Sequence, residues 1–340
     1  MTVLRTPWPP KLASPIEVAP LGARHASLWL VLGRSGELTL FDADGGTSSE
    51  KMTIALPEEP TREPWNGHAM TPQLHASADG RFAAIANDFG QRGLVVDLER
   101  RAVTMELDGQ DEDCETVPFS LAFFDIDGAC RLVHRTAWNR LDISDPATGT
   151  LLTDRGPTSS GHDLDYYHGR LEVSPDGAHV LDDGWVWHPA GIPTVWSLRR
   201  WLRENPWESE VGPSRCELAI RTHYWNHGMC WGSPRWFALA GIGDDDDTIV
   251  DGALIFELDD TGSIPMVDGR ARHRAFAGPA GNLFGDGDRL FSSDPTGLSI
   301  WDIGDGARVQ HVPSFCPTRH HRAARELAQI TADALLRFRY

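Results

Sequence analysis

Short apolar runs recur along the chain at near-constant intervals, and each is followed by a polar or acidic residue. The clearest run covers residues 298–302 and reads Leu-Ser-Ile-Trp-Asp, a composition that predicts a β-strand. Weaker copies end at Asp42, Asp97, Asp145, Ser197 and Glu257. The steps between successive run ends are 55, 48, 52, 60 and 45 residues. Spacing in and just above this range is typical of a β-propeller built from four-stranded blades.

Turn signals keep the same period as the strand-like runs. Asp-Gly pairs stand at residues 79–80, 127–128 and 176–177, with a looser one at 286–287. An Asp-Gly pair between apolar runs indicates a hairpin, because the favoured two-residue turn needs positive φ at both positions. The glycines precede the run ends by 17, 17, 20 and 15 residues. Because the run ends and the turn glycines recur with a similar spacing, both features support one repeated unit.

Six units fit between residues 16 and 312, with the fourth strand expected at residues 150–153 in the third unit and at residues 263–267 in the fifth. The two ends of the chain carry further strand candidates. Apolar runs remain at residues 2–5, 327–330 and 335–338. Because a ring of strands has no stable open edge, we expect residues 1–10 to complete a last blade together with residues 315–340. The predicted fold is therefore all-β, a single seven-bladed β-propeller domain spanning residues 1–340. A six-bladed ring with a C-terminal capping helix is the alternative.

One segment departs from the strand pattern. Residues 198–204 have an arginine-rich helical pattern, which Asn205 and Pro206 end. The sequence predicts a short helical insertion near residues 198–207, on the outer side of the fourth unit.

The net charge and the cysteine content restrict the classes of binding partner and the cellular compartment that we expect. The formal net charge is −18 and the sequence pI is near 5.1, which argues against binding of a nucleic-acid backbone. Five cysteines without a C-x-x-C pair suggest neither a disulfide framework nor a zinc ribbon. No run reaches the roughly 18 apolar residues of a membrane-spanning helix, and the N-terminus does not resemble a signal peptide. We expect a soluble cytoplasmic protein.

The repeat also carries a family resemblance. Its length and the Trp301-Asp302 pair resemble WD40-like seven-bladed propellers, and the resemblance covers essentially the whole chain. A composition rich in Ala, Gly, Asp and Arg, with only Lys11 and Lys51, is similar to that of proteins from GC-rich bacteria. The resemblance implies a seven-bladed bacterial repeat protein.

Candidate functional residues concentrate in the segments that lead into the inner strands, here called the approach loops. In a propeller these loops gather around one mouth of the central channel. Aromatic and imidazole groups recur in three of them, at residues 64–68, 162–169 and 223–228, which lead into the second, fourth and fifth units. A basic stretch around residues 270–274 adds to the predicted rim. The candidates for ligand or partner binding are Trp65, His68, Tyr166, Tyr167, Trp225, Asn226, Arg272 and His273.

Three interpretations of these residues compete. The first is a non-catalytic recognition propeller that binds a peptide, protein or small ligand, because Trp, Tyr and Arg are typical anchors of binding surfaces. The second is an enzyme of hydrolase, lyase or isomerase type, with His168, His227 and Asp165 in proton transfer. The third is that these side chains only fill blade interfaces.

The sequence offers little for other chemistries. It contains no H-E-x-x-H spacing and no G-x-S-x-G element, so neither a metal site nor a serine nucleophile is predicted. Four aspartates follow Gly243 and would repel a phosphate group. No cofactor is expected.

Overall fold

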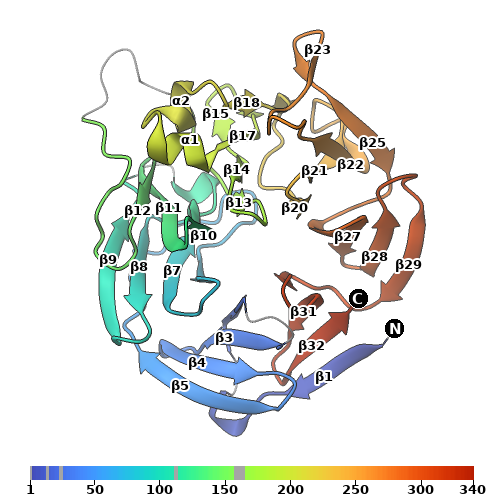
Figure 1. Ribbon diagram of the computed structural model, residues 1–340. Helices are drawn as coiled ribbons and strands as arrows, with labels where there is room; N and C mark the ends of the chain where they lie inside the picture. The colour runs from blue at the N-terminus through green and yellow to red at the C-terminus, as the bar shows by residue number, and fades with distance from the viewer. Residues whose placement is uncertain (1, 13–14, 23–25, 111–113, 157–164) are drawn as a thin grey trace.

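The computed structural model describes residues 2–12, 15–22, 26–110, 114–156 and 165–340. Antiparallel sheets stand around a common centre, and Figure 1 shows them as a closed ring viewed along its axis. Seven of the sheets in these ranges form the blades, and the fold is an all-β propeller. Inner strands of neighbouring blades contact one another from the seventh blade, through the first, to the sixth.

In each of the first three blades the strands follow one another in chain order, from the innermost to the outermost. The third has three strands and an isolated bridge between Ser144 and Leu151, in place of the fourth strand expected at residues 150–153. Short 3₁₀ turns η1 (Pro10–Leu12) and η2 (Cys114–Thr116) lie outside the sheets. The strands are β2 (Glu17–Pro20), β3 (Leu28–Leu32), β4 (Glu37–Asp42), β5 (Thr47–Thr53), then β6 (Thr71–Ala76), β7 (Phe82–Asp88), β8 (Arg92–Asp97), β9 (Ala102–Asp108), then β10 (Leu121–Ile126), β11 (Ala129–Ala137) and β12 (Arg140–Ser144).

The fourth blade carries the predicted helical insertion. Two short helices, α1 (Leu198–Arg203) and α2 (Glu208–Val211), lie between its third and fourth strands. The Ser197 hydroxyl caps α1 by accepting a bond from the Arg200 amide. Trp201 is buried edge-on against Trp196 and belongs to the core. The strands are β13 (Leu171–Val173), β14 (His179–Asp182), β17 (Thr194–Ser197) and β18 (Cys216–Glu217), beside a small sheet of β15 (Trp185–Val186), β16 (Ala190–Gly191) and β19 (Arg221–Thr222).

The fifth blade differs from the expectation in its outer strand. Residues 263–267, expected as the fourth strand, belong instead to a turn and to a hairpin that projects from the ring (Figure 1). Pro265 interrupts that segment and has no N–H to donate to a ladder. The strands are β20 (Met229–Ser233), β21 (Trp236–Ile242), β22 (Val250–Glu257) and outer β25 (His273–Ala277), with β23 (Met266–Val267) and β24 (Arg270–Ala271) in the hairpin.

The seventh blade contains strands from both ends of the chain. N-terminal β1 (Val3–Pro7) pairs antiparallel with β32, with Val3 opposite Phe338 and Pro7 opposite Ala334. Figure 1 shows the two termini side by side at this sheet. The sixth blade comprises β26 (Asn282–Asp286), β27 (Arg289–Asp294), β28 (Gly297–Asp302) and β29 (Arg308–Pro313), and the seventh β30 (Arg319–His321), β31 (Glu326–Ile330), β32 (Ala334–Arg339) and β1.

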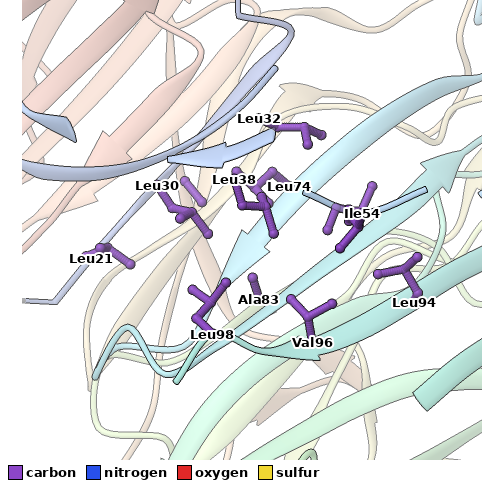
Figure 2. Close-up of a cluster of buried hydrophobic side chains, with 12 residues drawn as sticks. Leu21, Leu30, Leu32, Leu38, Ile54, Leu74, Ala83, Leu94, Val96 and Leu98 are labelled. Carbon is purple, nitrogen blue, oxygen red and sulfur yellow. The ribbon is translucent and has the colours of Figure 1, made fainter. Parts of the chain in front are cut away.

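Apolar side chains pack between neighbouring sheets and form the core. Figure 2 shows one such cluster, in which Leu30 and Leu38 of the first blade meet Leu74 and Val96 of the second. All four are at most 5% exposed. Full burial of an aliphatic side chain contributes about 1.5–3 kcal/mol, so these interfaces hold the blades in fixed relative positions.

A buried ionic network joins the seventh blade to the first, and we call this contact the closing seam. Arg337, 3% exposed, donates to Glu326 Oε1 at 3.0 Å and to Asp44 Oδ1 at 2.8 Å. The Ser27 hydroxyl donates to Glu326 Oε2 at 2.5 Å. Charged groups held this way orient the last sheet against the first.

Candidate functional site at the channel mouth

The approach loops of several blades meet over one end of the ring. Asn226 Nδ2 donates to the Thr116 carbonyl at 2.7 Å, and Trp225 Nε1 donates to the same oxygen at 3.2 Å. These bonds join loops that are 110 and 109 residues apart in sequence. The approach loops of the third and fifth blades are therefore in direct contact.

Four aromatic rings form a continuous stack across this mouth. Trp65 lies on Trp225 with ring centroids 5.2 Å apart, and Trp225 lies on Trp185 at 4.9 Å. Trp185 lies in turn on Tyr167 at 4.7 Å. We call these four residues the aromatic stack. Stacked and offset aromatic pairs add about 0.5–1.5 kcal/mol each beyond their burial.

Local backbone geometry places the two ends of the stack. Trp65 and His68 face each other across a two-residue turn in which Asn66 has φ 45° and Gly67 has φ 80°. This pair of positive φ values is the type I′ geometry that Asn-Gly favours. At the other end, Tyr167 and Trp185 form an isolated antiparallel bridge.

The middle and the ends of the aromatic stack differ in exposure. Trp225 and Trp185 are only 7% and 3% exposed, whereas Trp65 and Tyr167 are half-buried. Beyond Tyr167 lie Trp138, at 4.9 Å, and Trp187, which is 60% exposed. The middle of the stack therefore packs as core, and its ends present aromatic surface.

Two predicted site residues are buried inside the fourth blade. Tyr166 donates from its hydroxyl to the Ile192 carbonyl at 2.8 Å, and burial raises its pKa well above the ordinary value. His168 is fully buried, with Nδ1 2.6 Å from Asp182 Oδ2. Its carbonyl oxygen accepts a bond from Arg135 at 2.6 Å. Both side chains hold the fold together in this position, and neither faces solvent.

The remaining candidates of these loops are more accessible. Asp165 is exposed. His68 is half-buried and stacks on Phe89 at 4.6 Å. His227 stacks on Tyr224 with centroids 3.4 Å apart and keeps an exposed face. The surrounding protein still desolvates the imidazole, and this burial, with the nearby Arg221 charge, lowers the pKa of His227 to about 4. Its ring is therefore neutral near pH 7.

Arg272 and His273 lie elsewhere, so their predicted place on the rim is wrong. His273 begins β25, the outermost strand of the fifth blade, where it pairs with Phe256. The inserted hairpin shifts this segment outward in the sheet. Segment 157–164, which includes His162 and Asp163 of the predicted fourth approach loop, lies outside the described residues.

A cleft of about 430 Å³ opens beside the aromatic stack. We call it the mouth cleft. Its walls come from the approach loops of the fifth, sixth and seventh blades and from adjoining strand ends. Its polar and aromatic lining comprises Tyr224, Asn226, His227, Asp251, Asn282, Ser293, Asp294, Cys316 and Thr318.

Most of the cleft was not signalled by the sequence. Asn226 and His227 were candidates, but Asp251 and Asp294 sit at strand ends where aspartate is ordinarily a turn residue. Asp294 does serve a turn, because its Oδ1 accepts a bond from the Thr296 amide at 2.7 Å. Only the ring brings the two aspartates, which are 43 residues apart, to one cleft.

Charged groups also lie within the ring, close to the mouth. Burial raises the pKa of Asp88 to about 7 and that of Asp183 to about 6. The positively charged guanidinium of Arg170 interacts electrostatically with both carboxylates. Arg319 donates to Glu17 Oε1 at 2.9 Å. The sequence pattern gave no sign of this cluster.

Two features are absent from the described part of the chain, namely clustered metal-ligating side chains and a helix suited to cross a membrane. Within those residues, no group of three or more His, Cys, Asp or Glu side chains is placed to hold a metal ion. No helix among them has the length and apolar character needed to cross a membrane.

Comparison with known proteins supports the fold alone. No family model and no curated protein sequence matches the chain. A solved structure of hydrazine synthase from Kuenenia stuttgartiensis, a protein that contains a β-propeller, superposes with a TM-score of 0.56 at 13% sequence identity. The match covers 97% of this chain and 96% of that chain. Similarity at this level indicates shared architecture and carries no statement about activity.

Proposed function

We propose that this protein is a non-catalytic recognition propeller that binds a peptide, protein or small ligand at the channel mouth. The observation that carries the proposal is the mouth cleft, a cavity of about 430 Å³ built by the approach loops of three successive blades. Ligand pockets of roughly 300–1,000 Å³ with a few polar groups among aromatic ones are typical of small-ligand and side-chain recognition. Partner choice would then depend on loops that a rigid ring positions.

The arrangement of the predicted acid and base residues favours recognition over catalysis. His168 is fully buried against Asp182, whereas His227 lies in the mouth cleft and Asp165 is exposed. A general base must reach the proton it abstracts, within hydrogen-bond distance or through one water. A fully buried His168 has no such access to a ligand in the cleft.

The same proposal includes the finer family and cellular assignment. The third strands that end in Asp, Ser or Glu support a WD40-like bacterial repeat protein. Cys130, Cys216, Cys230 and Cys316 are free thiols in the described structure, which fits a reducing cytoplasmic compartment. Binding assays should therefore be run on reduced protein.

Ligand screening with matched histidine variants tests the proposal. His227 lines the mouth cleft, whereas His188 is exposed on a turn of the fourth blade and does not line it. We expect His227→Ala to weaken binding of any mouth ligand at least tenfold, while His188→Ala leaves it unchanged. Both variants should melt close to the parent protein. Equal binding by the two variants would reject the mouth as the recognition site.

A further inference from the structure

We propose that the mouth cleft selects an organic cation, namely an alkylammonium or guanidinium group. The group would come either from a lysine or arginine side chain of a partner or from a free small amine. This inference rests on the proposed function and names the ligand chemistry of the same site. It follows from the charge, the aromatic wall and the size of the cleft.

The charged groups in the cleft lining all have the same sign. Asp251 and Asp294 both line it, and no lysine or arginine does. Bonds from the Thr296 amide and hydroxyl, at 2.7 and 2.6 Å, hold the Asp294 carboxylate in one orientation. Burial alone would raise the pKa of Asp294, but these bonds lower it overall, so the group is ionised near pH 7. Two carboxylates in a concave site attract a cation and repel an anion.

Tyr224 and His227 form the aromatic wall of the cleft, and the Tyr224 ring already packs against one cation, the guanidinium of Arg221. The Arg221 guanidinium carbon lies 5.3 Å from the centre of the Tyr224 ring. Since His227 covers one face of that ring at 3.4 Å, the guanidinium occupies the other face. Arg221 is held there by its bonds to the carbonyls of Ala240, at 2.6 Å, and Gly241, at 3.2 Å. Its guanidinium is thus hydrogen-bonded to the backbone of two residues that line the cleft, whereas Arg221 itself does not line it.

The exposed face of His227 completes the site. Because its pKa is lowered to about 4, the imidazole is neutral near pH 7 and does not repel a positive ligand. Planar guanidinium groups stack on aromatic faces, and carboxylates bind them through paired N–H bonds. Asn282, which also lines the cleft, adds an amide oxygen that accepts N–H bonds.

The size of the cleft and the charge of the whole protein agree with a small cation. A volume of about 430 Å³ lies near the low end of ligand pockets, which suits one side chain or a small amine. The net charge of −18 steers cations toward the protein at low ionic strength. This net charge does not direct a cation to the cleft in particular, whereas the carboxylates of Asp251 and Asp294 do.

Calorimetric titration with four butyl probes tests the inference. The probes are n-butylguanidinium, n-butylammonium, neutral n-butanol and anionic butyrate. We expect both cations to bind at least tenfold more tightly than n-butanol, and butyrate not to bind. Rising salt should weaken the cations. A second arm compares agmatine with a capped Gly-Arg-Gly peptide, which separates a free amine from a partner side chain as the source.

Carboxylate variants assign the effect to the cleft. Asp251→Asn and Asp294→Asn should each weaken the cations about tenfold, whereas Asp260→Asn, which removes the same charge from an exposed turn outside the cleft, should not. If Asp294→Asn unfolds through loss of its turn bonds, Asp251→Asn alone decides. Cations that bind no better than n-butanol, or equally well to Asp251→Asn, would overturn the inference. A neutral or anionic probe in the cleft would then leave the proposed function standing, and an empty cleft with every probe would reject both.

Discussion

The closing seam provides a quantitative test of how the ring is held shut. Glu326 is fully buried and accepts bonds from Arg337, Arg339 and Ser27. In Glu326→Gln the shape is kept but the negative charge is lost, so Arg337 remains buried with Asp44 as its one anionic partner among the described residues. Removing one partner of a buried ion pair costs about 3–5 kcal/mol. Because Asp44 remains, we expect the lower end, about 3 kcal/mol.

This loss converts to a measurable fall in melting temperature. Unfolding entropy of about 2.1 cal/mol/K per residue gives about 0.7 kcal/mol/K for a chain of 340 residues. The expected shift for Glu326→Gln is therefore a fall of about 4 °C, measured by circular dichroism or calorimetry.

Asp333→Asn is the matched control in the same blade. Asp333 pairs with Arg5 of the N-terminal strand, but the two side chains are 70% and 52% exposed. Exposed ion pairs contribute about 0–1 kcal/mol, so this variant should shift the melting temperature by about 1 °C or less. Equal shifts in the two variants would show that the buried network does not hold the seam.

Three further predictions follow from burial and charge. Burial raises the pKa of Asp88 from 3.8 to about 7, so its contribution to stability is full below about pH 4 and is lost as the pH rises through about 7. Asp88→Asn should therefore raise the melting temperature at pH 8 and leave it nearly unchanged at pH 4. A melting temperature that rises at pH 4 and not at pH 8 would contradict a raised pKa for Asp88. Trp225→Ala removes a buried ring of the aromatic stack and should cost about 3–5 kcal/mol in denaturant unfolding, and a cost below about 1 kcal/mol would show that the stack is not core. Trp187→Ala, at a side chain 60% exposed, should stay within about 0.5 kcal/mol of the parent protein in the same assay, and a larger loss would mean that Trp187 is packed.

Much of the architecture could be predicted because local signals agree with the ring. Five of the six repeated run ends are the last residues of third strands, from β4 to β28, and Asp145 directly follows the third strand of its blade, β12. The Asp127-Gly128 turn has φ values of 53° and 75°, as the expected two-residue hairpin requires. In the Asp79-Gly80 and Asp176-Gly177 pairs only the glycine has positive φ. These turns lie where the sequence predicts them but do not have the predicted two-residue geometry.

The errors in the fold lie where pairing depends on distant partners. Residues 263–267 have strand composition, yet β25 occupies the edge of the fifth blade. Strand propensity reports how well a segment suits a half-buried surface, and which of two candidates pairs with β22 is decided by the loop between them. Outer strands carry the weakest signal because their side chains are the least buried.

The candidate site was predictable only in its outline. Meeting approach loops follow from the ring, and Trp65, Tyr167 and Trp225 do come together. Trp185 completes the stack from a small sheet that no periodic signal marked. Asp251 joins the cleft only through packing between blades, which no local pattern encodes.

A crystal of the protein soaked with a mixed library of cationic, neutral and anionic fragments would show directly whether the mouth cleft is the recognition site. We expect a bound fragment in the mouth cleft, against His227 and between the carboxylates of Asp251 and Asp294, with Asn226 still bonded to the Thr116 carbonyl. Fragments gathered only elsewhere on the ring, or approach loops that do not meet, would contradict it.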